Sequence, residues 1–368
     1  MGRLTGLRVC RFGSYDSHYS RNVIIAKCLK RAGADIVDVM DHGSLAARTP
    51  RLVGKALRER FDVILVGFRA HSDMLSASLL ARVRGVPLIF DPLVSRYEER
   101  VIDRQLVRPD SWLARWYRLI DASGCRLADT VLLETEMQVA HFARTFSIPA
   151  SRFRRVWLGA DDEIMYPRRS SAGGRPFTVF FYGRFSPLHG VEHIIRAAVI
   201  LQQRADAVRF VLVGAGQTYQ MARALAERVG ADTIEFVQPV PYTELAGMMS
   251  EADMCLGSFG TTARAQRVIP NKVFDALAVR RPVLTADTPG IREALTPGEH
   301  VWVCPAGDGE ALADAIALLK RDPDLRRSLA DNGYQRFTER FSLEAIARDL
   351  GEIVSHLLQG DIAHSLPR

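Results

Sequence analysis

The sequence predicts an α/β protein with two doubly wound, Rossmann-like domains. Short apolar segments alternate with segments of helical length, which is typical of parallel sheets covered by helices on both faces. One stretch without periodicity, rich in Pro, Ser and Gly, interrupts this alternation over residues 163–176, after which the alternation begins again. The length of 368 residues also suits two domains. We therefore expect one domain over residues 1–163 and another over residues 164–341.

In the first half, the expected elements follow from apolar runs and from the residues that end them. The run between Asp62 and Gly67 is continuously apolar, as expected for a strand buried on both faces. Gly33 and Gly85 follow helical patterns and can end a helix in the left-handed conformation. The expected strands are residues 7–12, 34–40, 62–67, 87–90, 130–133 and 153–158, and the expected helices are residues 21–32, 71–84, 111–127 and 136–145.

In the second half, the same alternation predicts six strands with helices between them. Pro282 ends a short helix over residues 272–279, because a proline cannot continue a helical hydrogen-bond ladder. Two helices close the chain, over residues 323–339 and from residue 342 onward. The expected strands are residues 178–182, 209–213, 234–237, 254–256, 283–285 and 301–303.

Composition narrows the class of protein. Hydrophobic residues make up 48% and charged residues 25% of the chain, no apolar run is long enough to span a membrane, and no signal peptide opens the sequence. The five cysteines are scattered without a C-x-x-C pair, which favours a reducing cytoplasm. The net charge of +7 lies in the first half. That half suits an anionic membrane surface or a phosphorylated acceptor, and no recognised nucleic-acid module accompanies its charge.

The helix over residues 272–279 combines three features that suit a nucleotide. Asn271 is a favourable N-cap residue, and a free helix N-terminus attracts phosphate. Lys272 and Asp275 are one turn apart on the more polar side, where the carboxylate could accept hydrogen bonds from a ribose diol. The alternative is an ordinary surface ion pair between these two residues.

A second candidate segment, residues 183–190, has the sequence G-R-F-S-P-L-H-G. It follows an expected strand and opens a helix, so its backbone N–H groups could reach an anion. Arg184 at the strand end could hold a diphosphate with its planar guanidinium group. The alternative is a turn that needs its glycines only for the turn itself.

This segment resembles the G-R-x-S-P-x-K-G motif of the family 4 glycosyltransferases, which have the two-domain GT-B fold. Residues 275–282, 210–216 and 287–293 resemble three further blocks of that family, in the family's order and spacing. The resemblance implies two Rossmann-like domains that face a central cleft, with a C-terminal helix over residues 342–368 crossing back to the first domain. It also implies a retaining, metal-independent hexosyltransferase that uses a nucleotide-diphosphate sugar and needs no cofactor.

Carried over onto this sequence, the resemblance implies roles for individual residues. Arg184 would bind the diphosphate, and His189 stands where the family has a lysine, so Lys272 would supply the missing charge. Asp275 would hold the ribose, while Arg267 stands where the family has its first glutamate. The loop over residues 257–267 is therefore expected to be rearranged around that site. The remaining residues expected at the sugar donor are Gly183, Gly214, Gly260, Thr261, Arg264 and Asn271.

The first half resembles the family in architecture alone, so its candidate residues come from position. The turn after the first strand would place Gly13, Tyr15, Asp16, His18 and Arg21 at the mouth of the cleft, on the acceptor side, unless it is simply a solvated turn. Asp91, at the end of the fourth strand, is expected to act in catalysis by holding a hydroxyl of the donor sugar. Its alternative role is to cap the turn before Pro92.

These expectations define a cytoplasmic glycosyltransferase that binds a nucleotide sugar, with Arg184, Lys272 and Asp91 as catalytic residues. The acceptor is expected to be a glycan or a lipid-linked glycan of cell-envelope, cell-wall or surface-glycan biosynthesis, with peripheral contact to an anionic membrane. The helix over residues 111–120 mixes aromatics with arginines, and either lies on a membrane or packs its aromatics on the sheet. Alternative functions are a sugar-nucleotide 2-epimerase and a sugar-nucleotide-binding protein without transfer activity.

Overall fold

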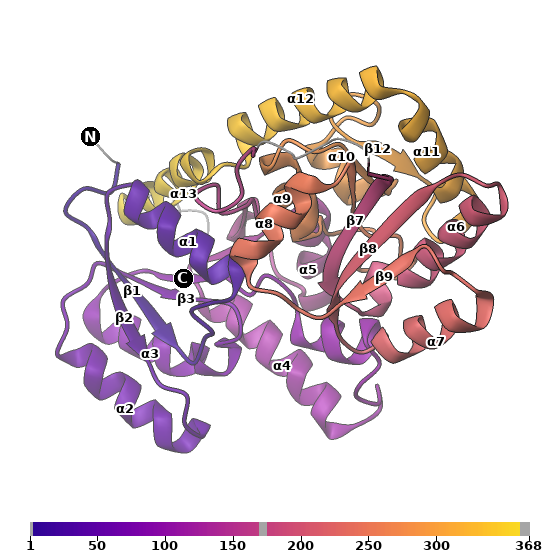
Figure 1. Cartoon of the computed structure of the whole chain (residues 1–368). Helices are drawn as coiled ribbons and strands as arrows, with labels where there is room; N and C mark the ends of the chain where they lie inside the picture. Colours follow the sequence, from indigo (N-terminus) through magenta and orange to yellow (C-terminus); the bar gives the residue numbers. More distant parts are fainter. Residues whose placement is uncertain (1–2, 169–174, 361–368) are drawn as a thin grey trace. The chain divides into compact units, whose positions relative to one another are not determined.

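The computed structural model describes residues 3–168 and 175–360, and the chain divides into two compact units (Figure 1). The division falls between Leu158 and Gly159, shortly before the expected boundary at residue 163. The chain returns to the first unit at Leu343. The stretch expected as a linker lies partly outside the described residues, at 169–174, and so does the end of the expected final helix, at 361–368.

The first unit is a six-stranded parallel sheet with helices on both faces. The strand order is β2-β1-β3-β4-β5-β6. Right-handed crossovers place α1 on one face and α2 to α5 on the other, and α13 packs against α1. The strands are β1 (Arg8–Gly13), β2 (Asp35–Met40), β3 (Val63–Val66), β4 (Leu88–Phe90), β5 (Thr130–Leu133) and β6 (Phe153–Arg155). The helices are α1 (Ser20–Arg31), α2 (Leu45–Leu57), α3 (Met74–Arg84), α4 (Trp112–Leu127), α5 (Glu136–Phe146) and α13 (Leu343–Leu358), with short 3-10 turns at His71–Asp73 and Ala150–Arg152 and a π-helical turn at Glu98–Asp103.

The second unit repeats the architecture with a parallel sheet in the order β12-β11-β10-β7-β8-β9. Its strands are β7 (Phe177–Arg184), β8 (Val208–Ala215), β9 (Ile234–Val237), β10 (Met254–Leu256), β11 (Val283–Ala286) and β12 (Trp302–Cys304). Its helices are α6 (Val191–Gln203), α7 (Tyr219–Val229), α8 (Tyr242–Glu251), α9 (Asn271–Ala278), α10 (Pro289–Ala294), α11 (Gly309–Arg321) and α12 (Pro323–Arg340), with a 3-10 turn at Pro187–His189. The two sheets confirm the predicted fold class.

Helix α2 was not expected from the sequence, because Pro50 lies inside it. A proline has no N–H to donate and crowds the preceding turn, so its presence argues against a helix. The helix nevertheless continues through Pro50, and the neighbouring Thr49 hydroxyl donates a hydrogen bond of 2.8 Å to the carbonyl of Leu45. The buried contacts of Leu52 and Ala56 with the core of the first unit outweigh the local preference.

Strands β7 and β8 are each longer than the sequence suggested. Gly183 pairs with Gly214, and Arg184 pairs with Ala215, so both strands continue beyond the apolar runs that predicted them. The extension makes Arg184 the last residue of the strand, which agrees with its predicted place at the strand end. A charged side chain at that position is held by a regular hydrogen-bonded ladder, which limits how far it can move.

Two residues at the start of α1 join the strand ends of the first unit. Arg21 is fully buried and binds Asp91, which follows β4, at 2.9 Å and 3.2 Å from its Nε to the two carboxylate oxygens. Its Nη1 also donates to the carbonyls of Val156 and Trp157 after β6. Asn22 donates from its side chain to the carbonyl of Phe68 after β3 and accepts from the Phe68 N–H. The first turn of α1 thereby connects loops that are far apart in the sequence.

Among residues 3–168 and 175–360, no helix combines the length and the apolar character that a membrane span requires. All five cysteines are free and buried.

We predict that Asp91→Ala lowers the free energy of unfolding of the first unit by about 3–5 kcal/mol, because the variant leaves the Arg21 guanidinium buried without its counter-charge. Urea unfolding followed by tryptophan fluorescence measures this effect, since Trp112, Trp116 and Trp157 all belong to the first unit. The control is Asp110→Ala, which breaks the exposed pair with Arg108 and should change stability by less than about 1 kcal/mol. Equal effects of the two substitutions would contradict the structural role of the buried pair.

Candidate functional site

The candidate site lies at the carboxyl ends of β7, β8 and β10 in the second unit. The chain runs from β7 outward to β8 and β9, and then returns to β10 on the opposite side of β7. The boundary between β7 and β10 is therefore the topological switch point, where open α/β sheets bind their ligands. The loops that follow β7 and β10 meet at this point and form its floor.

The two loops are in direct backbone contact. The Phe259 N–H donates to the carbonyl of His189 at 2.9 Å, and the Gly260 N–H donates to that of Leu188 at 3.2 Å. A Cβ on Gly260 would lie 2.3 Å from the Pro187 carbonyl oxygen, and one on Gly190, whose φ is +61°, would lie 2.5 Å from the Gly260 nitrogen. Only glycines allow this approach, which explains the glycine positions that the sequence analysis identified.

Arg184 ends β7 with an exposed side chain. Its strand neighbour Gly183 is flanked by two cationic candidates: a Cβ there would lie 3.2 Å from His189 Cε1 and 3.3 Å from Lys272 Nζ. The structure thus brings His189 and Lys272 together around one glycine, although Lys272 is remote in sequence, and Arg184 is the next residue of the strand. The sequence alone gave no measure of this proximity.

Lys272 occupies a different environment from the one predicted. It is buried and not on an exposed polar side of α9, because the helix is enclosed from Lys272 to Ala278. Its Nζ lies 3.4 Å from the hydroxyl of Ser258 and 4.9 Å from the centre of the Phe181 ring. Burial lowers the pKa of Lys272 to about 7, and the nearby Asp275 opposes that shift. The ammonium is therefore only partly protonated near neutral pH.

His189 lies on the other side of Gly183, at the end of the 3-10 turn Pro187–His189. Its ring meets the edge of Phe181 with centroids 5.9 Å apart, and its Nδ1 is 3.5 Å from the hydroxyl of Ser186. The imidazole of His189 and the Nζ of Lys272 therefore both lie near the Phe181 ring and near Gly183.

Asp275 is also buried, and tyrosine hydroxyls occupy both of its carboxylate oxygens. Tyr242 donates to Oδ1 at 2.6 Å, and Tyr182 donates to Oδ2 in a very short hydrogen bond. Burial raises the pKa of Asp275 to about 7, against the effects of the two hydrogen bonds and of Lys272. The surface ion pair with Lys272, which the sequence left open, is not formed. Tyr182 and Tyr242 were missed because neither belongs to a motif.

Two details of α9 correct the sequence analysis. The helix begins at Asn271, and Pro270 takes the N-cap position in an extended conformation. Asn271 is therefore the first helical residue and not the cap. The reason is that Pro270 has a fixed φ that suits the position before a helix and no N–H that would need a partner there. The helix N-terminus remains a predicted phosphate contact.

The loop between β10 and α9 contains the remaining predicted residues of the sugar-donor site. Thr261 is exposed, and Arg264 and Arg267 are half-buried. Gly290 at the start of α10 packs on this loop, since a Cβ there would lie 2.9 Å from the Arg267 carbonyl carbon. On the neighbouring strand, Gly214 lies directly against Gly183. Of these residues, Gly214 lies directly beside the end of β7 that carries Arg184.

The acceptor-side candidates in the first unit separate into two groups. Asp16 and His18 are exposed, as a residue at a cleft mouth must be. Tyr15 and Arg21 are buried instead, which corrects the prediction that they are accessible. Tyr15 donates from its hydroxyl to Asp38 Oδ1 at 2.8 Å, because the turn after β1 folds this ring back over the sheet. Gly13 leaves room for Ala70, whose Cβ would lie 2.8 Å from an added Cβ.

Asp91 likewise differs from the prediction that it holds a sugar hydroxyl. Its carboxylate is 1% exposed and is bound by Arg21. Burial raises its pKa, while Arg21 opposes the shift. The pair connects α1 to β4. Asp91 therefore stabilises the fold, and its carboxylate is not accessible to a ligand.

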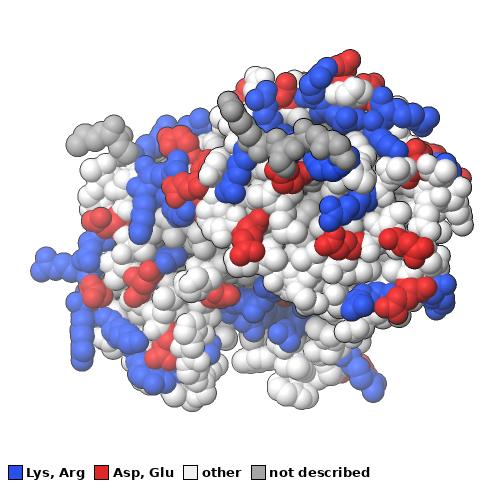
Figure 2. All heavy atoms as spheres, in the orientation of Figure 1, with Lys and Arg blue, Asp and Glu red and all other residues white. Residues whose placement is uncertain are grey.

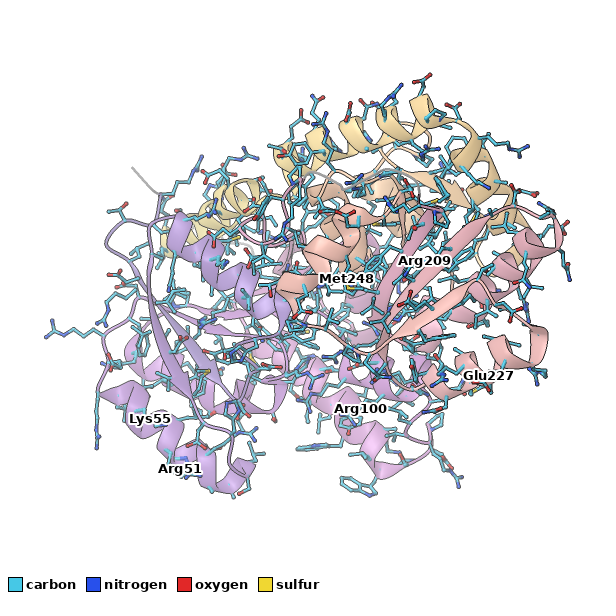
Figure 3. The ribbon with its side chains drawn as sticks, viewed as in Figure 1. Arg51, Lys55, Arg100, Arg209, Glu227 and Met248 are labelled. Carbon is cyan, nitrogen blue, oxygen red and sulfur yellow. The ribbon has the colours of Figure 1, made fainter. Side chains whose placement is uncertain are left out.

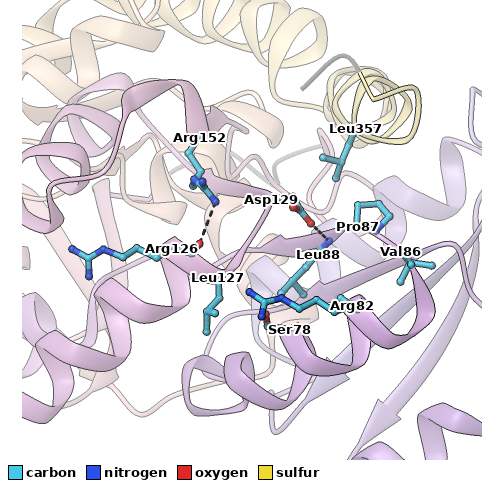
Figure 4. A pocket seen from close by; sticks show the side chains of 12 residues that line it. Ser78, Arg82, Val86, Pro87, Leu88, Arg126, Leu127, Asp129, Arg152 and Leu357 are labelled. Atoms are coloured by element: carbon cyan, nitrogen blue, oxygen red, sulfur yellow. Dashed lines mark hydrogen bonds between the residues drawn. The ribbon is translucent and has the colours of Figure 1, made fainter. Parts of the chain in front are cut away.

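The first unit also has a pocket of about 470 Å³ at the amino ends of β4 and β5 (Figure 4). Its polar groups are mostly occupied: Asp129 accepts from the Leu88 N–H at 2.7 Å, and Arg152 donates to the Arg126 carbonyl at 3.2 Å. Ligands in this class of fold bind at the opposite, carboxyl ends of the strands. We therefore place the candidate site in the second unit. In the described part of the chain, no three His, Cys, Asp or Glu side chains gather as a metal site would require.

Comparison with known proteins identifies the family of the chain. Residues 165–336 match the family model described as "Glycosyl transferases group 1", and residues 26–159 match the "Glycosyl transferase 4-like domain". The chain belongs to the group 1, or family 4, glycosyltransferases. The residues that surround Arg184 and Lys272 in this glycosyltransferase all fall within the first of the two matches.

Named relatives and solved structures support the same family. The glycosyltransferase is 25% identical over 300 residues to the alpha-D-kanosaminyltransferase of Streptomyces kanamyceticus, which covers 77% of this chain and 75% of the relative. It is 27% identical over 305 residues to the D-inositol 3-phosphate glycosyltransferase of Kribbella flavida. This match covers 76% of this chain and 68% of the relative. Its fold matches HepE from Anabaena, which was solved in complex with UDP and glucose, with a TM-score of 0.72 and 15% identity. The match covers 95% of this chain and 99% of HepE. The fold of the glycosyltransferase is GT-B.

The buried state of Lys272 predicts that binding of a nucleoside diphosphate takes up protons near pH 8. The free lysine, with a pKa of about 7, is mostly neutral at that pH. A bound diphosphate favours the charged ammonium and raises the pKa, so that a proton enters with the ligand and affinity falls as the pH rises above about 7. Calorimetric titration with UDP in buffers of different ionisation enthalpy measures the uptake. Lys272→Met is the matched variant, and an unchanged uptake in it would assign the proton to another group.

Proposed function

We propose that this glycosyltransferase moves a sugar from a nucleotide-diphosphate sugar to an acceptor hydroxyl with retention of the anomeric configuration. The observation that supports it most is the approach of His189 and Lys272 to Gly183, next to Arg184 at the end of β7, at the switch point of the second sheet. The structural relative HepE, which was solved with UDP, supports a nucleotide sugar as the donor. Retention is proposed from the family.

The proposed chemistry depends on charge at the leaving group. As the bond between the sugar and the diphosphate breaks, negative charge grows on the phosphate oxygens, and positive groups already in place stabilise it. Arg184 offers a planar, permanently charged group at the exposed end of β7. Lys272 acquires its full charge only when the diphosphate is present, so its stabilisation is coupled to binding. We propose that no metal ion takes part.

For the ribose we propose Asp275, held in place by the hydroxyls of Tyr182 and Tyr242. The two hydrogen bonds fix the orientation of the carboxylate at the start of the binding event. A ribose hydroxyl that binds it has to share an oxygen with a tyrosine or displace it. Because the carboxylate is already desolvated and oriented, binding of the ribose does not have to bring it into position.

We further propose that the protein works in the cytoplasm on a glycan or lipid-linked acceptor of cell-envelope or surface-glycan biosynthesis. The supporting observations are its free cysteines and the excess positive charge of the first half, which suits an acidic or membrane-attached acceptor. The exposed Asp16 and His18 are the acceptor-side residues that the structure leaves accessible among those predicted.

We predict that Arg184→Ala weakens binding of UDP or another nucleoside diphosphate by about 10- to 100-fold, as expected for the loss of a charge-assisted contact of about 1.5–3 kcal/mol. Isothermal titration with UDP, GDP, ADP and TDP identifies the base and measures the loss. The matched control is Arg209→Ala, which removes an arginine from the exposed side of the adjacent strand β8, where it pairs with Glu235 (Figure 3). Equal binding by the wild type and Arg184→Ala would sink the proposed diphosphate site.

The transfer reaction is tested with the nucleotide sugar that binds. We expect the product to keep the anomeric configuration of the donor, as seen by the coupling constant of the anomeric proton. An inverted product would refute the proposed retention. Conversion of the nucleotide sugar without any acceptor would instead identify an epimerase.

A further inference from the structure

The outer surface of α4 exposes large apolar side chains instead of burying them. Trp112 is 75% exposed, Trp116 44% and Leu119 55%. Their spacing of four and three residues places them on one face of the helix. The tryptophans therefore do not pack on the sheet, which was one of the two roles considered for this helix. Groups of exposed aromatic and aliphatic side chains of this size are unusual on the surface of a soluble domain.

A second segment that contacts α4 also exposes apolar side chains. Ile102 and Leu106, in and just after the π-helical turn, are about half exposed. Arg100 in this turn lies over the ring of Tyr117 on α4, with 5.9 Å to the ring centroid, so the segment packs beside the helix (Figure 3). We refer to Trp112, Trp116 and Leu119 with Ile102 and Leu106 as the apolar platform.

Arginines form the next row on α4. Arg115, Arg118 and Arg126 line a groove of about 360 Å³ between α4 and α5, which Phe146 closes on the α5 side. Arg126 donates to the Phe146 carbonyl at 2.6 Å. To the residues that the structure describes, Arg115 and Arg118 make neither a hydrogen bond nor an ion pair, and both are exposed. The groove therefore presents two available guanidinium groups beside the apolar platform.

Acidic groups do not neutralise this surface. The only carboxylate of α4, Asp121, is buried and accepts hydrogen bonds from Ser95 and from the backbone of Tyr97. Asp110, just before the helix, is paired with Arg108 at 2.8 Å and interacts more weakly with Arg115 through charge alone. Over the projecting end of α4 the visible surface is largely uncharged (Figure 2). The chemistry of the face is apolar and cationic.

We propose that the apolar platform and the arginine groove dock this unit on an anionic lipid bilayer. Tryptophan rings settle at the level of the lipid headgroups, and guanidinium groups bind lipid phosphates with two parallel hydrogen bonds. Both requirements are met by adjacent rows of one helix. A second copy of this chain is a poorer occupant, because an isologous contact would bring Arg115 and Arg118 of the two copies together.

This assignment adds a location for the chain and does not depend on which sugar it transfers. A bilayer would hold α4 in the plane of the lipid headgroups. The proposed nucleotide-sugar site uses different residues, at the carboxyl ends of the strands of the second sheet. Each basic side chain near an anionic surface strengthens binding about fivefold. Arg115 and Arg118 together therefore contribute about thirtyfold, and the two tryptophans add an apolar contribution that salt does not remove.

The test is co-sedimentation of the full chain with vesicles of phosphatidylcholine mixed with phosphatidylglycerol, against vesicles of phosphatidylcholine alone. We expect binding to the anionic vesicles with a blue shift of tryptophan emission. We expect about thirtyfold weaker binding for the double variant Arg115→Gln, Arg118→Gln, and at least about tenfold weaker binding for Trp112→Ser, Trp116→Ser. Circular dichroism checks that each variant is folded.

Helix α7 of the second unit offers matched controls, because it also exposes apolar and arginine side chains. Met221→Ser and the double variant Arg223→Gln, Arg228→Gln should bind vesicles as the wild type does. Absence of binding, equal binding to both kinds of vesicle, or equal losses in the α7 controls would overturn the proposal. A dimer that forms without vesicles and disappears in the tryptophan variant would overturn it in favour of a second copy.

Discussion

The enclosure of α9 is the constraint on which the candidate site depends. The helix is buried from Lys272 to Ala278, and two of these residues are ionisable. Taking an ammonium or a carboxylate out of water is costly unless polar partners compensate. Lys272 contacts the hydroxyl of Ser258 and the face of the Phe181 ring. Asp275 accepts hydrogen bonds from two tyrosine hydroxyls. The same constraint favours a glycine at position 183, because a side chain there would press against Lys272.

The two units use polar residues at their strand ends in opposite ways. In the first unit, Arg21 and Asp91 neutralise each other and join three loops, so their charge is not available to a ligand. In the second unit, Arg184 ends its strand exposed and Lys272 has a lowered pKa. The same architecture therefore yields one set of charges that stabilises the fold and another that can respond to an anion.

The family's usual lysine and first glutamate are replaced by His189 and Arg267, and the structure gives a physical account of the first replacement. His189 and Lys272 both lie next to Gly183 and near the Phe181 ring. A lysine that comes from a different helix can thus reach the same loop. At the second position, the backbone of Arg267 packs against Gly290 at the start of α10.

The sequence by itself determined the class of fold, the order of nearly all elements and the segments that form the site, because apolar periodicity and glycine positions are local properties of the chain. It also pointed to Arg184, Lys272 and Asp275 as candidate site residues. Only the tertiary structure decided that Lys272 and Asp275 are buried, that Tyr182 and Tyr242 bind the carboxylate, that Arg21 holds Asp91, and that the tryptophans of α4 face outward. Whether a side chain is buried, and which groups bind it, depends on the helices that pack over it. Those helices come from distant parts of the sequence.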